Sequence, residues 1–352
     1  MAAPSALLGL GTDHTCALRG DGAVRCWGGG MDGQLGWNAA SSSLVPVSVS
    51  GIADAIGVAA GHFHSCAVLR SGMVQCWGDN ASGQLGNGST MPSLVPADVM
   101  GLTDAIAVDG GEAHSCALTA GHRVQCWGHN FYGQLGDGTT ATTNLPVVVQ
   151  NLTTAVSICT GFRHSCALLD DGTATCWGDN QDGQLGDGTN DQANAPVAVT
   201  GIRDAVHVGC GEFHSCAALA DGQLACWGQN MAGQLGDGSM TSSNVPVIVS
   251  GLANAAAANG GFYHTCARLT DMTVRCWGDN VEGQLGNGTN NASTTPVVAQ
   301  GLDTVVEVRT GFHHSCARLR EGGARCWGTN PTGQLGNGTM TSSNVPIDTM
   351  PF

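Results

Sequence analysis

One histidine and two cysteines recur along the chain at fixed spacing, and they are the residues with the most obvious chemistry. The histidines are His14, His64, His114, His164, His214, His264 and His314. Each is followed two residues later by a cysteine, and ten residues after that by a second cysteine with a tryptophan behind it. Imidazole and thiolate groups serve as metal ligands, bases and nucleophiles, and paired cysteines form disulfides. Which of these roles applies depends on the strands and loops that position the histidines and cysteines.

The repeating unit is 50 residues long. In the fourth repeat it includes 161–168, then Cys176-Trp177-Gly178, then Gly183-Gln184-Leu185-Gly186. Seven units, at 1–50, 51–100, 101–150, 151–200, 201–250, 251–300 and 301–350, account for all but the last two of the 352 residues. A fixed period of this length is typical of solenoids and propellers. We therefore expect one closed array over 1–352, not several unrelated domains.

Each repeat predicts four antiparallel strands. In the fourth repeat these are 155–159, 164–169, 173–177 and 197–199, with a three-residue hairpin loop at 170–172 and a long loop at 178–195. A proline opens the fourth strand in every repeat, which suits an outer edge strand. Four-stranded sheets of this kind bury their faces by radial stacking. The sequence thus predicts an all-β, seven-bladed β-propeller with the recurring tryptophan between blades. Because the chain starts with a first strand (6–10) and ends with a fourth (345–349), we expect ring closure by edge packing.

The composition excludes several classes of function. The chain has 54 glycines, only 11% charged residues and a net charge of −15, with twelve arginines and no lysine. An acidic chain without basic clusters is a poor partner for nucleic acid or for an anionic membrane. No apolar run is long enough to insert into a membrane. Residues 1–11 are apolar but short and lack a charged start, so they do not form a complete signal peptide. We expect a monomer.

The paired cysteines fit disulfides better than zinc, because neither the CxxC spacing nor a matching histidine spacing recurs. A three-residue hairpin loop places Cys166 opposite Cys176 in a non-hydrogen-bonded pair, about 4.5 Å apart at Cα. The predicted disulfide cysteines are Cys16, Cys26, Cys66, Cys76, Cys116, Cys126, Cys166, Cys176, Cys216, Cys226, Cys266, Cys276, Cys316 and Cys326. The alternative is fourteen buried thiols acting as small apolar residues. Disulfides imply an extracellular or periplasmic location. Cys159 and Cys210 lie outside the pattern and are either paired or free.

The other chemical groups have structural explanations. Seven histidines spread around a ring do not converge on one metal, and we expect each to bond to a neighbouring turn. The Asp, Asn and Gly residues of the long loop could hold Ca²⁺, but ordinary turn geometry also explains them. No nucleophile elbow, P-loop or Ser/His/Asp set stands outside the repeat. We therefore predict no catalytic residues, no metal and no cofactor.

The succession GxxHSCAL, VxCWGxN, GQLGDGT and a Pro-led strand closely resembles the regulator of chromosome condensation repeat, whose members form seven-bladed propellers. The resemblance covers nearly the entire chain. The paired cysteines depart from the nuclear members and look like the variant found in secreted bacterial proteins of the family. Members that exchange guanine nucleotide on a small GTPase use an inserted β-wedge, and the constant period here leaves no room for one. The resemblance therefore implies a fold and a binding scaffold without implying exchange activity.

Two short windows vary between repeats. One is the pair of residues before each recurring histidine, and the other begins the long loop. Eight of the nine Phe and Tyr residues fall in these windows, together with acidic residues, and both windows emerge on one face of the ring. Such residues on a rigid scaffold are typical anchors of protein interfaces. The predicted partner-binding residues are Phe63, Glu112, Phe131, Tyr132, Phe162, Arg163, Asp182, Glu212, Phe213, Phe262, Tyr263, Glu282, Phe312 and His313.

The sequence thus predicts a non-enzymatic scaffold that binds a protein partner through this face. An alternative use of the same phenylalanines is to plug the gap between the first turns of adjacent blades. A carbohydrate or small-ligand binder is the alternative function, and separate pockets between blades would favour it. A guanine-nucleotide exchange factor and an enzyme at the channel mouth are weaker alternatives. The partner itself cannot be named from the residues.

Overall fold

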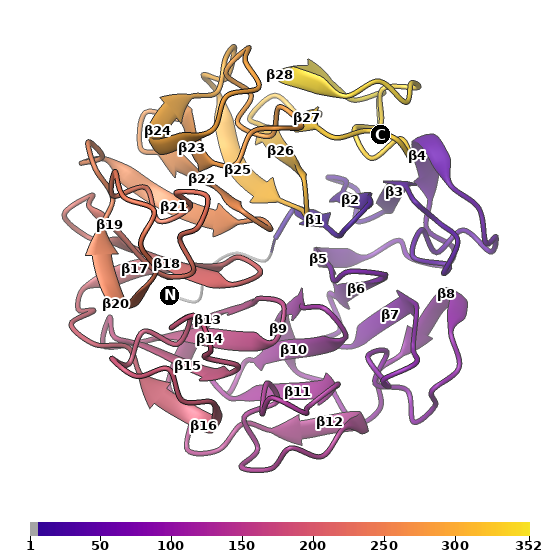
Figure 1. Ribbon diagram of the computed structural model, residues 1–352. Helices are drawn as coiled ribbons and strands as arrows, with labels where there is room; N and C mark the ends of the chain where they lie inside the picture. The colour runs from indigo at the N-terminus through magenta and orange to yellow at the C-terminus, as the bar shows by residue number, and fades with distance from the viewer. Residues whose placement is uncertain (1–5) are drawn as a thin grey trace.

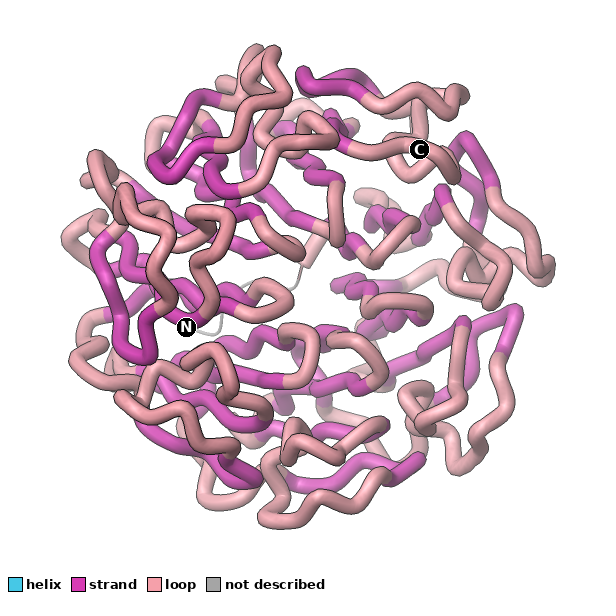
Figure 2. Tube along the Cα trace, viewed as in Figure 1, coloured by secondary structure: helices cyan, strands magenta, loops and turns pink. Residues whose placement is uncertain are grey.

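The computed structural model describes residues 6–352 and shows seven four-stranded antiparallel sheets arranged around a central axis (Figure 1). Strands joined by loops make up all of the described chain, and none of these residues is helical (Figure 2). The predicted all-β propeller with four strands in each of seven blades is confirmed. Within the described residues there is accordingly no helix that could cross a membrane. Residues 1–5 of the apolar start lie outside the described part.

Every blade has the same strand order, from the axis outwards. The first strands are β1 (Leu8–Leu10), β5 (Ala55–Ala60), β9 (Ala105–Gly110), β13 (Ala155–Thr160), β17 (Ala205–Cys210), β21 (Ala255–Gly260) and β25 (Val305–Thr310). The second strands are β2 (His14–Leu18), β6 (His64–Leu69), β10 (His114–Thr119), β14 (His164–Leu169), β18 (His214–Leu219), β22 (His264–Leu269) and β26 (His314–Leu319). The third strands are β3 (Val24–Gly28), β7 (Val74–Gly78), β11 (Val124–Gly128), β15 (Ala174–Gly178), β19 (Leu224–Gly228), β23 (Val274–Gly278) and β27 (Ala324–Gly328). The fourth strands are β4 (Ser43–Ser48), β8 (Ser93–Asp98), β12 (Thr143–Val148), β16 (Ala193–Ala198), β20 (Ser243–Ile248), β24 (Ser293–Val298) and β28 (Ser343–Asp348).

The fourth strands differ from the prediction. Each begins three residues before its proline, so that Pro196 lies inside β16 and does not open it. The physical reason is that β16 is the outermost strand of its sheet and pairs on one side only, with β15. A proline whose missing N–H would face away from the partner strand costs no ladder bond. Pairing with β15 is therefore present on both sides of the proline, at Ala193 and at Val197, with a register shift between them.

All seven predicted hairpin disulfides are present. Cys166 and Cys176 are opposite each other in the β14–β15 register, with their Cα atoms 4.0 Å apart. The other six pairs have Cα separations of 4.0–4.1 Å. The loop that sets this register turns through Gly172 at a φ of 79°, the left-handed conformation expected of glycine in a three-residue hairpin. An eighth disulfide joins Cys159 to Cys210 across two blades, which settles the state of the two cysteines outside the repeat pattern.

The recurring tryptophans lie between blades, as predicted. The side chain of Trp227 is completely buried, and its Nε1–H donates to the carbonyl oxygen of Gln184 in the preceding blade at 2.9 Å. The remaining six tryptophans make the same bond to the preceding blade at 2.7–2.9 Å. Each tryptophan thus contributes apolar area to the core and satisfies its single polar atom across the blade boundary.

The recurring histidines form a closed ring of hydrogen bonds, but their partner is not the turn that we expected. His164 Nε2 lies 2.9 Å from Ser215 Oγ of the next blade, and Ser215 Oγ donates to the Gln184 carbonyl at 3.0 Å. Because that hydroxyl already donates its only hydrogen to the Gln184 carbonyl, it accepts from His164, and Nε2 of His164 is the donor. A glycine precedes the turn because a Cβ at Gly161 would collide with the His164 ring. Burial lowers the pKa of His164 to about 3, so the ring is neutral.

The seventh blade closes onto the first through these same bonds. His314 Nε2 donates to Thr15 Oγ1 at 2.9 Å, and Trp27 Nε1 donates to the Gln334 carbonyl at 2.9 Å. β1 belongs to the first sheet and β28 to the last, so no strand is exchanged between the ends. The first and last blades therefore pack against each other without exchanging a strand, with β1 in contact with β25 and β26, and in Figure 1 the orange-to-yellow seventh blade lies beside the indigo first blade.

Candidate protein-binding face

The two variable windows lie side by side in every blade. The turn between the first and second strands, here called the first turn, is bonded to the start of the long loop between the third and fourth strands. In the second blade Asp79 N donates to the Phe63 carbonyl at 2.9 Å, and the other six blades have the equivalent bond at 2.7–3.0 Å. The seven first turns and seven long loops thus form one end of the ring. We call this surface the loop face.

The first turns are also tied to one another around the axis. The amide of Phe162 donates to the Glu212 carbonyl of the next blade at 3.1 Å, and Glu112 N donates to the Phe162 carbonyl at 3.2 Å. All seven first turns are joined in this way, with donor–acceptor distances up to 3.4 Å. Neighbouring first turns are therefore held by the backbone, whatever side chains they carry.

The side chains of the first turns meet over the axis. Ring centroids are 5.3 Å apart for Phe162 and Phe213, 5.7 Å for Phe213 and Phe262, and 4.0 Å for the stacked pair Phe262 and Phe312. The His62 ring completes this group, 5.1 Å from Phe162 and 5.9 Å from Phe312. We call these five residues the axial cluster, and all five are half-buried. The phenylalanines thus pack against one another and partly fill the gap between the first turns, which was the alternative role considered for them from the sequence.

An ion pair crosses the axial cluster. His62 Nε2 donates to both carboxylate oxygens of Glu212, each at 2.9 Å, although the two residues are 150 positions apart in the sequence. Burial alone would lower the pKa of His62, but the Glu212 carboxylate, helped by Glu112, outweighs it and raises that pKa above its usual value. His62 is therefore disposed to carry a proton, unlike the seven neutral histidines of the interblade ring.

A second group joins the third and fourth blades. Arg163 Nε donates to Glu112 Oε2 at 3.0 Å, and Arg163 Nη1 donates to the Tyr132 hydroxyl at 2.8 Å. The guanidinium lies 4.6 Å from the ring centroids of both Tyr132 and Phe162. Cation–π contacts of this kind add to the ion pair and fix the planar guanidinium in one orientation. Arg163 thereby connects the axial cluster to a long loop.

The long loops have a rigid internal framework. Asn130 is fully buried; its Oδ1 accepts from Leu135 N at 3.0 Å and its Nδ2 donates to the Ala141 carbonyl at 3.1 Å. Gln134 Oε1 accepts from Tyr132 N at 3.0 Å. Asn and Gln at the equivalent positions make the same bonds in other blades. The polar atoms that suggested a calcium loop are thus engaged in turn geometry.

Several strongly exposed apolar residues of the loop face share one repeat position, which we call the tip of the long loop. Phe131 is 69% exposed, and the same repeat position carries Met31 at 70%, Met231 at 69% and Val281 at 66%. Of these four, the sequence reasoning selected only Phe131. The signal was available, because three apolar residues share its repeat position inside an otherwise polar loop.

Acidic residues dominate the charge of the loop face. Nine acids and one arginine occupy the two windows; the acids are Asp13, Asp32, Asp79, Glu112, Asp179, Asp182, Glu212, Asp279 and Glu282. Burial raises the pKa values of Asp13 and Asp32, and each also has an acidic neighbour that raises it further. Burial likewise raises the pKa of Asp182, whose Oδ2 accepts from Gln229 Nε2 at 3.2 Å. The face therefore concentrates negative charge around a central aromatic cluster.

The repeat itself decides the family. A model of the regulator of chromosome condensation (RCC1) repeat matches residues 21–68, 71–118, 122–168, 171–218, 221–268 and 273–318, and a second model of the same repeat matches six shorter stretches. The chain belongs to the RCC1 repeat family. A comparison with curated protein sequences gives no match.

Solved RCC1-type propellers share the fold. A crystal structure of human WBSCR16 is similar with a TM-score of 0.86 at 24% identity, covering 94% of each chain. Yeast RCC1 (Prp20), solved bound to Kap60, has a TM-score of 0.83 at 21% identity over 99% of this chain and 85% of the other. A second structure of Saccharomyces cerevisiae Prp20p, described with its binding to Gsp1p and histones, has a TM-score of 0.83 at 22% identity over 99% of this chain and 87% of the other. At these identities the likeness establishes the architecture only.

The remaining predicted residues of this RCC1-repeat propeller flank the axial cluster. The Tyr263 ring lies 4.0 Å from Phe262, and the His313 ring lies 4.6 Å from Phe312. Phe63 is 39% exposed, and Glu282 N donates to Gln284 Oε1 at 2.9 Å within its long loop. The fourteen predicted residues thus all lie on the loop face. They divide into a half-buried group around the axis and exposed groups at loop tips.

The axial channel lies beneath the cluster. His62, Glu212 and Phe312 line its mouth, and Asp109 and Arg309 line its wall. Burial raises the pKa of Asp109, whose Oδ2 accepts from Thr160 N at 2.9 Å in the next blade. Arg309 forms an ion pair with Glu307 at 2.9 Å and donates to Asn259 Oδ1 of the preceding blade at 3.2 Å. Asp109 and Arg309 of this wall thus link neighbouring blades.

Proposed function

We propose that this propeller is a non-enzymatic scaffold that holds a protein partner on its loop face. One observation carries the proposal: the aromatic rings of the axial cluster are continuous, and exposed apolar tips surround them. A flat, continuous patch of aromatic residues with charged neighbours suits a protein surface. A sugar binder would instead need separate, near-equivalent pockets between blades. The continuity of the cluster therefore favours the protein over the carbohydrate alternative.

The loop face is also preorganised. The first turns are joined by backbone bonds, Arg163 is held by three neighbours, and buried asparagine and glutamine side chains fix the long loops. Binding to such a surface orders few side chains, so little conformational entropy is lost. Yeast Prp20, with the same fold, was solved with Kap60 and described with Gsp1p and histones, which supports the use of this architecture for protein recognition.

The disulfides support a location outside the cytosol. Eight disulfides point to an oxidising environment, since such bonds are rare where thiols are kept reduced. We extend this to an extracellular or periplasmic location. The constant 50-residue period leaves no inserted wedge between blades, so guanine-nucleotide exchange is not part of the proposal.

The test uses exposed residues whose loss leaves the fold intact. Phe131→Ser with Met231→Ser removes two exposed apolar side chains at loop tips. The control, Val148→Ser with Ile248→Ser, removes two exposed apolar side chains of the outer strands, which are 48% and 50% exposed. Each immobilised protein would be incubated with the native extracellular fraction, and captured proteins identified. We expect a protein that is held by the wild type and by the outer-strand variant and is lost from the loop-tip variant. Equal capture by all three folded proteins would contradict the proposal.

A further inference from the structure

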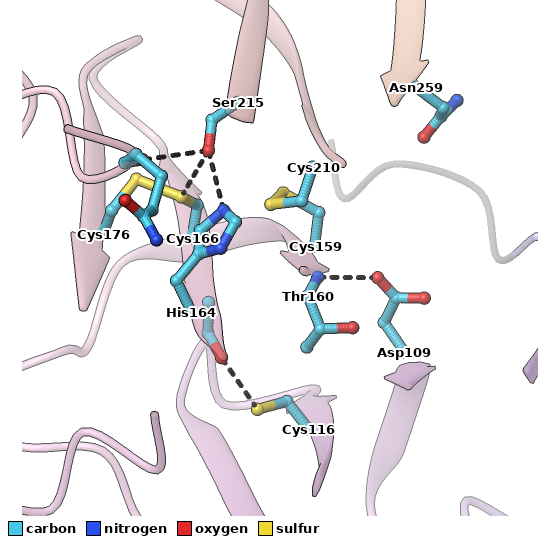
Figure 3. Close-up of a disulfide and its surroundings, with 12 residues drawn as sticks. Asp109, Cys116, Cys159, Thr160, His164, Cys166, Cys176, Cys210, Ser215 and Asn259 are labelled. Carbon is cyan, nitrogen blue, oxygen red and sulfur yellow. Dashed lines mark hydrogen bonds between the residues drawn. A yellow bond between two sulfur atoms is a disulfide. The ribbon is translucent and has the colours of Figure 1, made fainter. Parts of the chain in front are cut away.

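The eighth disulfide differs from the other seven in its surroundings. Cys159 is the next-to-last residue of β13 and Cys210 is the last residue of β17, and their disulfide joins the fourth and fifth blades at the channel wall. Their exposures are 4% and 8%, whereas the cysteines of the seven hairpin disulfides are at most 1% exposed. Figure 3 shows this pair at the channel side of the Cys166–Cys176 disulfide. It is thus the disulfide that a small solute in the channel meets first.

Three sulfur atoms gather at this point. The Sγ atoms of Cys159, Cys166 and Cys210 all lie within 4.8 Å of one another, although all three are in disulfides. Cys159 and Cys166 are also direct cross-strand partners in the β13–β14 register. Cα atoms of directly opposed residues are about 4.5–5.5 Å apart, which is within the range that a disulfide spans. Cys166 can therefore pair with Cys159 as well as with Cys176.

No other blade offers this choice. The positions equivalent to Cys159 hold Gly9, Ala59, Asp109, Gly209, Asn259 and Arg309. In the blade before, Asp109 makes its interblade link by a hydrogen bond to Thr160 N, as Figure 3 also shows. An alternative sulfur partner thus exists only in the fourth blade, where two disulfides are in contact.

We propose that Cys159–Cys210 is a thiol-exchange site for small monothiols, and that Cys166 receives the released sulfur. An incoming thiolate attacks Sγ of Cys210, the more exposed of the two. A mixed disulfide forms there, the Cys159–Cys210 bond breaks, and Cys159 leaves as a thiolate. That thiolate then attacks Sγ of Cys166, forming Cys159–Cys166 and releasing Cys176 as a thiolate that takes a proton from water. The monothiol is the only reagent consumed, and one thiol is produced for each one used.

This exchange changes the connection between two blades. Before it, the fourth and fifth blades share a covalent bond; after it, the fourth blade keeps one internal disulfide, and Cys210 carries the small thiol into the channel. The proposal does not rest on protein binding at the loop face. It concerns the channel wall, and the experiments below involve no partner.

The first experiment uses Cys210→Ser, which leaves Cys159 as a thiol beside Cys166. The purified variant would be alkylated with iodoacetamide in its native state, and the peptides mapped without reduction. We expect the label on Cys176 as well as on Cys159, together with a Cys159–Cys166 disulfide. The yield of Cys176 label at short times should rise about tenfold per pH unit below the thiol pKa, because the thiolate is the attacking species. Label on Cys159 alone at every pH would overturn the proposal.

The second experiment uses wild-type protein and does not depend on the variant folding. Native protein would be incubated with glutathione, quenched with iodoacetamide and mapped in the same way. The expected products are glutathione on Cys210, a Cys159–Cys166 disulfide and label on Cys176, with the six other hairpin disulfides intact. Cys159→Ser with Cys210→Ser is the control and should leave Cys176 unlabelled. Eight intact disulfides, a glutathione adduct with Cys166–Cys176 intact, or equal labelling of all hairpin cysteines would each contradict the exchange.

Discussion

Replacing Ser215 by alanine tests whether the interblade ring of hydrogen bonds stabilises the propeller. The Ser215 hydroxyl is buried between two blades, where it accepts from His164 Nε2 and donates to the Gln184 carbonyl. In the variant, the Gln184 carbonyl keeps its bond from Trp227 Nε1, so its loss is small. The Nε2–H of His164, however, is left without an acceptor in a site closed to water. A buried donor without a partner costs about 1–3 kcal/mol, so we expect a loss of about 2 kcal/mol in the free energy of unfolding.

The chain supplies the matched control for this change. Threonine occupies the equivalent position in two blades, and Thr265 Oγ1 accepts from His214 Nε2 at 2.8 Å while donating to the Gln234 carbonyl at 2.7 Å. Ser215→Thr keeps the hydroxyl, and we expect its unfolding free energy to stay within about 0.5 kcal/mol of the wild type. Both variants would be unfolded in guanidinium chloride with the disulfides intact, followed by tryptophan fluorescence. If alanine were tolerated as well as threonine, the hydrogen-bond argument would be wrong; equal losses in both would indicate sensitivity to shape instead.

Three further predictions concern other parts of the molecule. The seven ring histidines have pKa values well below the ordinary 6.5, about 3 for His164, because burial disfavours the charged ring. The unfolded chain therefore binds more protons below pH 6.5, and denaturant unfolding should show a free energy of unfolding that is constant from pH 7 to 6.5 and falls progressively from there to pH 4. Glu212→Gln removes the charge that raises the pKa of His62, and because burial then dominates, NMR titration should show that pKa falling below its usual value instead of lying above it. Met272 occupies the hairpin position that glycine fills in five other blades, at a φ of 65°, so Met272→Gly should raise the unfolding free energy by about 1 kcal/mol in the same denaturant assay, and an unchanged or lower value would contradict the strain argument.

Much of the fold could be predicted because the same pattern of strand, turn and cysteine positions occurs in all seven repeats. The hairpin loop at 170–172 sets the register that brings Cys166 to Cys176, and one such loop per blade was enough to predict seven disulfides. The proline misled the prediction of where β16 begins, since the sequence indicated an outer edge strand but not the pairing of Ala193 with Gly178 before the proline. The histidine partner was missed because Ser215 lies 51 residues from His164, and only the packing of two blades brings them together.

The site was predicted less completely, for a related reason. The residue types and repeat positions identified the correct face, but His62 and Glu212 are 150 residues apart, and their pairing depends on how seven turns converge at the axis. Likewise, the sequence could not separate Phe162, which packs within the axial cluster, from Phe131, which projects from a loop tip. The exposure of a side chain depends on how the seven blades assemble and does not follow from the sequence of a single repeat.

Variation between repeats is therefore not in itself a sign of binding. The positions that face the channel also vary between repeats, yet several of their side chains link one blade to the next: Asp109 bonds to Thr160 N, Cys159 forms a disulfide, and Arg309 donates to Asn259 Oδ1 at 3.2 Å. These side chains are engaged in contacts between blades. The loop tips differ because Phe131 and its counterparts are about two-thirds exposed and are not needed to join blades. Apolar area that stays in water on a rigid loop contributes no hydrophobic free energy to folding. A partner that covers this area would gain that free energy on binding.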